Sequence, residues 1–383
     1  MFRNLLKSML VLFSTLFVLF GVVEIAVRIF APQSGRTFVA DPFIRTIHEK
    51  NVSVRQERED VVALSKTNKQ GFMGDDFVVG KEENAFRIAV IGDSFTEAFE
   101  VGTNNSFTAL LEKGLNEKNG LLSYETYNFG ISGAGSTHEL LAYEHYAKPY
   151  NPDMVIWQIY LGNDLSDDLL LIDEVKGAES PNATEARTGY LRAFFSNNFH
   201  SPRFFLRKIE KIKAIYSLLA RYNIVSRNQH FYDNQDKQNT YPFIYDIFNS
   251  GEKTIFTDNL SLTCKFAKEF KEKTFRDGIP LLVVLIPAKY QVLEEDWGKL
   301  LSKFPGMQEK TWDRLQPLMP IKECLGEQKI DYIDMYPIFE KIVKDGGERM
   351  YFVTDDHFNV FGHQLTAEAL KAKISGAGSE RDK

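Results

Sequence analysis

Two short segments of the sequence carry side chains that can act as a nucleophile and as its base. Ser94 lies in the segment GDSF at 92–95, and a serine hydroxyl becomes a nucleophile only when a general base takes its proton. His357 lies in TDDHFN at 354–359, where neighbouring carboxylates can hold its ring in one tautomer for that task. Taken singly, Ser94 is equally well a helix N-cap, and His357 a surface residue of an acidic loop.

Two further segments can stabilise a developing negative charge on oxygen. NFGISGAG at 128–135 contains glycines that let backbone amides approach a ligand, and LGND at 161–164 contains the side-chain amide of Asn163. Tight turns also select glycine, asparagine and aspartate, so each segment alone is a weak indication. The order and combination of all the segments indicate acyl-transfer chemistry more strongly than any one of them.

Alternating strands and helices are predicted to position these segments. Nearly continuous apolar runs predict buried strands, and helical spacing of apolar residues predicts the helices between them. The expected strands are 86–92, 124–130, 153–162, 280–287 and 330–335, and the expected helices are 107–115, 137–147, 260–274, 310–325 and 362–374. This alternation favours a mostly parallel sheet with helices on both faces. Segments that follow parallel strands converge on one edge of such a sheet.

The four segments together resemble the conserved blocks of the SGNH (GDSL-like) hydrolases. IGDSFTEAFEV is similar to the first block, NFGISGAG to the second, LGND to the third and DDHFNVFGHQLTAEAL to the last, and they frame nearly all of residues 84–375. The resemblance implies an α/β fold of the flavodoxin-like, three-layer α/β/α kind. It also implies a mechanism without a metal or an organic cofactor.

The resemblance assigns roles to individual residues. Ser94 would be the nucleophile, and His357 the general base that takes its proton and returns it to the leaving alcohol. The backbone amides of Ser94 and Gly133, with the side chain of Asn163, would form the oxyanion hole.

One position departs from the common pattern, which has aspartate three residues before the histidine. That position is Thr354 here. We expect Asp355, two residues before His357, to orient the ring, as in members with an Asp-x-His-x-Asn arrangement. Adjacent residues in an extended loop point to opposite sides, so Asp356 is the poorer candidate. A backbone carbonyl is the remaining alternative.

The expected function is a serine hydrolase that cleaves an acyl or acetyl ester of a small molecule, lipid or glycan. An O-acyltransferase acting on a cell-surface glycan would use the same residues and stays open as an alternative. A non-catalytic, membrane-tethered binding protein is the third hypothesis. It is disfavoured because the chain has all four of the residues expected for catalysis, namely Ser94, Gly133, Asn163 and His357. With 46 basic and 52 acidic residues and a net charge of −6, the chain gives no reason to expect nucleic acid as a partner.

The N-terminus predicts a membrane anchor. Arg3 and Lys7 precede an uncharged run at 8–23, which can span a bilayer if Lys7 and Glu24 reach the interfaces. A cleaved signal peptide is the competing interpretation, but no clean cleavage site follows the run. The positive residues favour a short cytoplasmic tail, which predicts a single-pass membrane protein with its catalytic domain on the extracytoplasmic side.

The predicted organisation is therefore a tail and signal-anchor at 1–31, a stalk and the start of the domain at 32–83, the hydrolase domain at 84–375 and a polar tail at 376–383. Between about 165 and 258 the strand–helix rhythm fails. This insertion contains a basic, helix-like piece at 204–222 that is either a lid over the site or a peripheral packing element. The chain has only two cysteines, Cys264 and Cys324, whose pairing the sequence leaves open.

Overall fold

A computed structural model describes residues 2–30, 38–57, 61–117, 121–169, 199, 201–202, 204–205, 241 and 243–381. The chain divides into two compact units, one formed by 1–37 with 178–230 and the other by 38–177 with 231–383. All of the predicted site residues belong to the second unit. Most of the predicted insertion, and of its basic piece at 204–222, lies outside the described residues.

The first unit contains helix α1 (Phe2–Phe30). Among the described helices, only α1 contains a stretch, Lys7–Phe30, that is long and apolar enough to cross a membrane. Signal sequences also have this property. The stretch extends farther than the uncharged run at 8–23. Glu24, next to that run, is buried against Arg28 and Ser201, since Arg28 Nε donates to its Oε1 at 2.7 Å and the Ser201 hydroxyl to its Oε2 at 2.7 Å.

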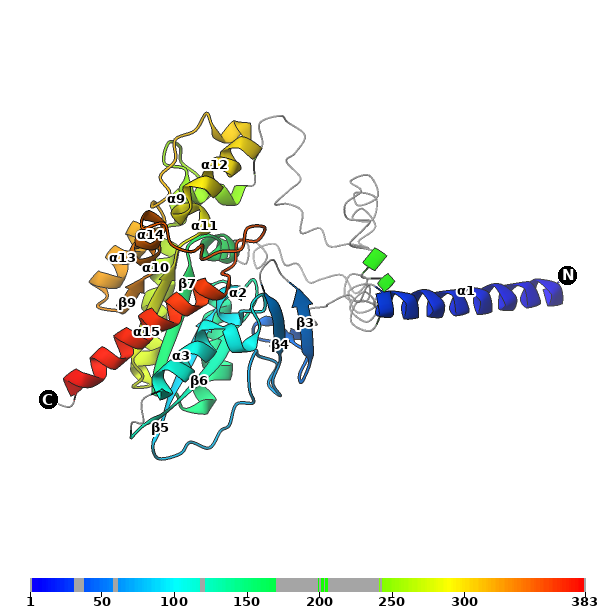
Figure 1. Cartoon of the computed structure of the whole chain (residues 1–383), viewed down its shortest axis with the longest axis horizontal. Coiled ribbons are helices and arrows are strands. Elements are labelled where there is room, and N and C mark those ends of the chain that lie inside the picture. Colours follow the sequence, from blue (N-terminus) through cyan, green and yellow to red (C-terminus); the bar gives the residue numbers. More distant parts are fainter. Residues whose placement is uncertain are drawn as a thin grey trace. The chain divides into compact units, whose positions relative to one another are not determined.

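The second unit is built on a five-stranded parallel sheet with the order β6-β5-β7-β8-β9 (Figure 1). Its strands are β5 (Ala85–Gly92), β6 (Ser123–Gly130), β7 (Met154–Tyr160), β8 (Leu281–Ile286) and β9 (Asp331–Asp334). Each lies within about two residues of its predicted range. The central strand β7 is buried at every position, which explains its almost uninterrupted apolar sequence.

Alternate residues of the strands face two separate hydrophobic cores. Ile88 and Val90 of β5 belong to one core, whereas Ala89 and Ile91 belong to the other. The first core is covered by α3 (Phe107–Asn116), α12 (Glu294–Lys303), α14 (Tyr336–Lys344) and α15 (Val360–Arg381), and the second by α4 (Ser136–Ala142), α10 (Ser261–Arg276) and α13 (Leu318–Glu327). Figure 1 shows α15 running alongside α3 on one face. These layers confirm the predicted α/β/α sandwich.

Residues 38–66 form two β-hairpins that the sequence did not predict. Strands β1 (Phe38–Asp41) and β2 (Arg45–His48) pair in one hairpin, and β3 (Ser53–Glu57) and β4 (Val62–Lys66) pair in the other. Side chains from β2 and its surroundings, including Ile47 and Phe72, pack into the second core. This part of the region predicted as a stalk and the start of the domain therefore packs against the sheet.

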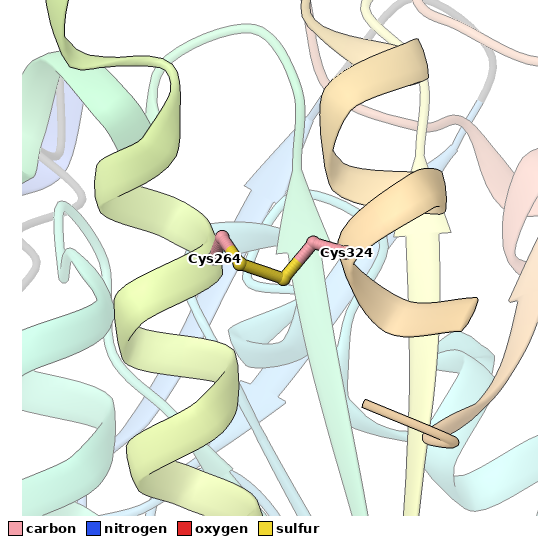
Figure 2. Close-up of a disulfide and its surroundings, with 2 residues drawn as sticks. All are labelled: Cys264 and Cys324. Atoms are coloured by element: carbon pink, nitrogen blue, oxygen red, sulfur yellow. A yellow bond between two sulfur atoms is a disulfide. The ribbon is translucent and has the colours of Figure 1, made fainter. Parts of the chain in front are cut away.

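A disulfide joins Cys264 of α10 to Cys324 of α13, two neighbouring helices on the same face of the sheet (Figure 2). Their Cα atoms lie 5.7 Å apart, within the usual range for a disulfide. The structure thus contains the pairing that the sequence left open.

Two predicted helices differ at their ends. The helix expected at 310–325 begins only at Leu318, after a turn at 314–317 that ends in Pro317. The last helix begins at Val360 and continues to Arg381, beyond the expected end at 374. No proline interrupts this C-terminal stretch.

Candidate active site

The site is built where three neighbouring strands end. In the sheet Gly92 of β5 is aligned with Gly130 of β6, and Ile91 of β5 with Trp157 of β7. The segments that follow β5, β6 and β7 therefore emerge side by side at the carboxyl edge, where open α/β sheets bind their ligands. Ser94 follows β5, Gly133 follows β6 and Asn163 follows β7.

Ser94 is the first residue of the short helix α2 (Ser94–Glu97). Asp93 caps this helix, since its side chain accepts a hydrogen bond from Phe95 N at 2.9 Å. Ala98 ends the helix in the left-handed region, at φ 57°, and its N–H donates to Ser94 O at 2.9 Å. The turn holds Ser94 at the sheet edge, where it is 7% exposed.

Close packing at the strand ends requires two glycines. A Cβ at Gly92 would lie 2.3 Å from Gln158 Oε1, and one at Gly130 would lie 2.1 Å from Glu97 N. No side chain fits at either position. The same Gln158 Oε1 accepts from Asp93 N at 3.2 Å and from the Thr96 hydroxyl at 2.8 Å, which ties both ends of the turn to β7.

His357 is carried by a tight loop before α15. Tyr351 and Phe358 form an isolated antiparallel bridge at the base of this loop, and Phe352 N donates to His357 O at 3.1 Å. The ring centroid of His357 lies 5.2 Å from that of Phe95, on the turn of the nucleophile. We call residues 351–358 the histidine loop.

The structure brings Ser94, His357 and Asp355 into one hydrogen-bonded chain. Oγ of Ser94 lies 2.8 Å from Nε2 of His357, and Nδ1 of His357 lies 2.5 Å from Oδ1 of Asp355. An ionised carboxylate only accepts hydrogen bonds, so Nδ1 carries a proton and the neutral imidazole leaves Nε2 to accept from the serine hydroxyl. His357 N also donates to Asp355 Oδ1 at 3.0 Å, which holds the carboxylate beside Nδ1 of the ring.

Asp356 is directed elsewhere. Its Oδ1 lies 3.2 Å from Nζ of Lys289, and it accepts a hydrogen bond from the hydroxyl of Tyr290 at 3.1 Å. The two aspartates therefore have different partners, although the backbone of the loop is bent instead of extended. Lys289 and Tyr290 were not singled out from the sequence, although Lys289 comes three residues after the end of β8 and so lies at the same sheet edge.

Negative charge surrounds the imidazole. Burial lowers the pKa of His357, but the charge of Glu100, the hydrogen bond to Asp355 and the charges of Asp355 and Asp93 act in the opposite direction and raise that pKa to about 9. The imidazolium form is thus stabilised beside Ser94, as a base that gains a proton during attack requires. Glu100 has no signal in the sequence beyond its position six residues after the serine.

Two of the three predicted oxyanion donors, Gly133 and Asn163, lie in loops, and the third, Ser94, begins α2. Gly133 is exposed and has φ 69°, a left-handed conformation that disfavours a side chain. Asn163 Nδ2 donates one hydrogen bond to Asp167 Oδ2 at 2.8 Å, and an amide nitrogen carries a second N–H. Asp167 thereby holds the side chain of Asn163 in place.

A group of buried carboxyl groups lies around these loops. Burial is the main cause that raises their pKa values. The pKa is about 6 for Asp93, about 7 for Asp168 and about 8 for Asp167. Burial also raises the pKa of Glu139 and of Asp164. Each of these groups therefore keeps its proton to a higher pH in the folded protein than a carboxyl group in water does. In the described part of the chain, no group of three or more His, Cys, Asp or Glu is arranged to hold a metal ion.

The second histidine of the last segment, His363, has a structural place. It is buried, and its Nδ1 accepts a hydrogen bond from Phe107 N at 3.2 Å, at the start of α3. Burial lowers its pKa to about 3, so the ring is neutral at physiological pH. His363 therefore joins α15 to α3.

Two family profiles match the chain. The profile of GDSL-like lipases and acylhydrolases matches residues 88–271, which include Ser94, Gly133 and Asn163. The profile of the SGNH hydrolase-like domain of the acetyltransferase AlgX matches residues 246–382, which include Asp355 and His357. No curated protein sequence matches the chain significantly.

Solved structures of similar fold are distant in sequence. An acetyl xylan esterase, AlAXEase, is 14% identical with a TM-score of 0.41, and the match covers 76% of this chain and 100% of the esterase. A lipase/acylhydrolase from Enterococcus faecalis is 13% identical with a TM-score of 0.40, covering 76% of this chain and 96% of that one. TesA is 12% identical with a TM-score of 0.38, covering 74% and 95%.

Proposed function

We propose, since the chain contains a GDSL/SGNH hydrolase-like domain, that the protein is a serine esterase acting through an acyl-Ser94 intermediate. The observation that carries the proposal is the hydrogen-bonded chain from Ser94 through His357 to Asp355. A serine activated by a histidine that a carboxylate orients is the arrangement by which unrelated folds perform acyl transfer.

In the proposed reaction Oγ of Ser94 attacks the ester carbonyl carbon while Nε2 of His357 takes the hydroxyl proton. The tetrahedral intermediate collapses as His357 returns that proton to the leaving alcohol, and the acyl group stays on Ser94. Water, deprotonated by the same Nε2, then attacks the acyl carbon and releases the carboxylic acid. Asp355 keeps the ring in the productive tautomer and stabilises the imidazolium in both half-reactions.

The oxyanion would accept hydrogen bonds from the N–H groups of Ser94 and Gly133 and from the amide of Asn163. Support for this assignment comes from the sheet register, which places the three residues after adjacent strands. The contact of Asn163 with Asp167 leaves a second amide N–H for the oxygen. Fixed donors of this kind supply a large part of the rate acceleration in acyl transfer.

The test is hydrolysis of a p-nitrophenyl ester series, from acetate to palmitate, by the full-length protein in detergent micelles. Ser94→Ala and His357→Ala are assayed beside the wild-type protein. We expect turnover in the wild type alone, with a preference along the series that reports the size of the acyl pocket. A well-folded wild-type protein without turnover on any ester would contradict the esterase proposal.

An O-acyltransferase is the second candidate, favoured by the match of residues 246–382 to the AlgX acetyltransferase profile. In that reaction a glycan hydroxyl takes the place of water in the second step. The candidate is tested by adding an oligosaccharide acceptor to the p-nitrophenyl acetate reaction and analysing the products by mass spectrometry. Acetylated oligosaccharide with little free acetate identifies a transferase, and free acetate alone identifies a hydrolase.

We further propose that α1 anchors the protein and that the second unit lies on the extracytoplasmic side. The apolar stretch Lys7–Phe30 and the positive residue Arg3 support this orientation. The disulfide between Cys264 and Cys324 supports it independently, because disulfides persist in oxidising compartments. Protease added to intact cells from which any outer barrier has been removed should digest the second unit, whereas a cytoplasmic domain would be protected.

A further inference from the structure

We propose that Lys289 is a positioning residue that holds the histidine loop in the conformation in which Asp355 orients His357. The inference rests on the proposed serine-esterase function and concerns the same site. Lys289 begins helix α11 (Lys289–Val292), three residues after β8, whereas Asp355 and His357 lie more than sixty residues later.

The ammonium group of Lys289 is bound by the backbone of the histidine loop. Nζ donates to the carbonyl oxygens of Asp355 at 3.1 Å, Val353 at 3.3 Å and Phe352 at 3.4 Å. Three carbonyl groups of one short loop converge on a single cation. The path of the backbone from 352 to 355 is therefore curved around Nζ.

Burial makes these contacts decisive for the loop. Lys289 is 4% exposed, and a buried ammonium group must be compensated by hydrogen bonds and opposite charge. Its charge is compensated by Asp356 Oδ1 at 3.2 Å and by Asp296 Oδ1 at 3.6 Å. If the ammonium group is removed, water cannot easily take its place at this buried position. The three carbonyl groups of the loop then lack the hydrogen-bond donor that holds them together.

Lys289 also helps to hold the two adjacent aspartates on opposite sides of the loop. It attracts the carboxylate of Asp356, with help from the Tyr290 hydroxyl at 3.1 Å, to one side of the loop. The carboxylate of Asp355 is left on the other side, where it accepts from Nδ1 of His357. Lys289 Nζ contacts the backbone of the histidine loop and the carboxylates of Asp356 and Asp296, so its effect on the reaction passes through the backbone of Asp355.

The experiment is a double-mutant cycle with Lys289→Met and Asp355→Asn in the full-length protein, measured as kcat and KM on the best p-nitrophenyl ester. Methionine keeps the length and apolar stem of lysine. The buried carboxylate of Asp296 keeps two hydrogen bonds from Arg349 Nη2, both at 2.7 Å, and the carboxylate of Asp356 is half-exposed, so neither is left both buried and unpaired. Lys322→Met is the matched control, because Lys322 pairs with Asp334 at 2.7 Å elsewhere in the same unit.

We expect Lys289→Met to lower kcat on the order of 10-fold to 100-fold with little change in KM, as small displacements of a catalytic group do. In the Asp355→Asn background the same substitution should lower kcat less than about threefold, because the two residues act as one unit. Lys322→Met should stay within about twofold of wild type.

The inference is overturned if Lys289→Met has wild-type kcat, or if its effect is equally large with and without Asp355. If Lys289→Met does not melt cooperatively, Lys289→Gln, which retains hydrogen-bond donors but not the charge, takes its place in the cycle. Failure of the esterase proposal can be told apart from failure of the Lys289 proposal. In the first case neither wild type nor Asp355→Asn would show turnover that depends on Ser94.

Discussion

Nε2 of His357 lies 2.8 Å from Oγ of Ser94, although 263 residues separate the two along the chain. The first strand of the parallel sheet delivers Ser94, and the loop before the last helix delivers His357. Because nothing local joins them, their contact depends on the complete sheet and on the closing helix α15, which packs against α3. The predictions below test what this contact does.

The ester-cleavage rate should rise with pH and level off above about pH 9. Only the neutral imidazole can take the proton of Ser94, and the surrounding negative charge raises the pKa of His357 to about 9. The measurement is kcat/KM between pH 6 and 10, in a buffer series of constant ionic strength. A profile already flat at pH 7 would show that the imidazole is neutral there and that Glu100 and Asp355 do not exert this influence.

Asp355→Asn should lower kcat on the order of 10²-fold to 10⁴-fold, because the charge that stabilises the imidazolium is lost and the wrong tautomer becomes accessible. Asp356→Asn should change kcat less than about fivefold, since Asp356 contacts Lys289 and Tyr290 instead of the imidazole. Steady-state kinetics of the two variants, with equal melting temperatures as a control, compare the roles directly. Equal losses in both variants would refute the assignment of Asp355.

Asn163→Ala should lower kcat on the order of 10²-fold to 10³-fold with little effect on KM, as expected for a donor that binds the oxyanion in the transition state. Ser166→Ala is a suitable control in the helical segment 164–169 that follows Asn163, because its hydroxyl donates to the backbone oxygen of Asn163, at 2.7 Å, and not to the side-chain amide. Near-wild-type turnover of Asn163→Ala would remove Asn163 from the proposed oxyanion hole.

The folded protein should lose thermal stability as pH rises from about 5 to 9. Burial raises the pKa of Asp93, Asp168 and Asp167 to about 6, 7 and 8, so the folded state retains protons that the unfolded chain releases near pH 4. The stability that these groups contribute is complete below their unfolded pKa and disappears as pH passes through their folded pKa. His357, with its raised pKa, acts in the same direction.

The measurement is calorimetry of wild type and Asp167→Asn across this range. The variant does not ionise at position 167, so its melting temperature should exceed that of wild type at pH 9 and approach it at pH 5. A parallel decline in both proteins would show that Asp167 is not a source of the pH dependence.

Reduction of the disulfide should destabilise the second unit without changing the chemistry at Ser94. Closing a loop with a sequence separation of 60 contributes about 4 kcal/mol in the chain-entropy account. The double variant Cys264→Ser/Cys324→Ser should therefore melt at a lower temperature and keep its kcat at 25 °C. If dithiothreitol leaves the melting temperature of the wild type unchanged, the disulfide does not contribute in this way.

The sheet and the sequence segments at its edge were predictable because a buried parallel strand leaves a strong pattern. The runs that became β5 and β8 are apolar at nearly every position, and Gly92 and Gly130 end their strands where no Cβ fits. The fold class is confirmed by the layers, and Ser94, His357 and Asp355 lie together as the resemblance implied. Their catalytic roles stay predictions.

Other features depend on contacts that leave no local pattern. The hairpins at 38–66 are short strands with mixed polarity, and Ile44 and Ile47 are buried only by packing against the sheet domain. The sequence around Lys289 gives no sign of its role, because the role depends on contacts with the histidine loop more than sixty residues later. The different partners of Asp355 and Asp356 likewise become visible only once Lys289 and His357 are in place.

The central claim is that Ser94 is a nucleophile activated by His357, and covalent capture tests it most directly. The full-length protein is treated with an alkyl fluorophosphonate, digested and mapped by mass spectrometry, beside Ser94→Ala and His357→Ala. We predict one phosphonylated residue, Ser94, in the wild type, none in Ser94→Ala, and modification of His357→Ala slowed about 10³-fold or more. Rapid modification at another serine, or none in a folded protein that cleaves esters, would contradict it.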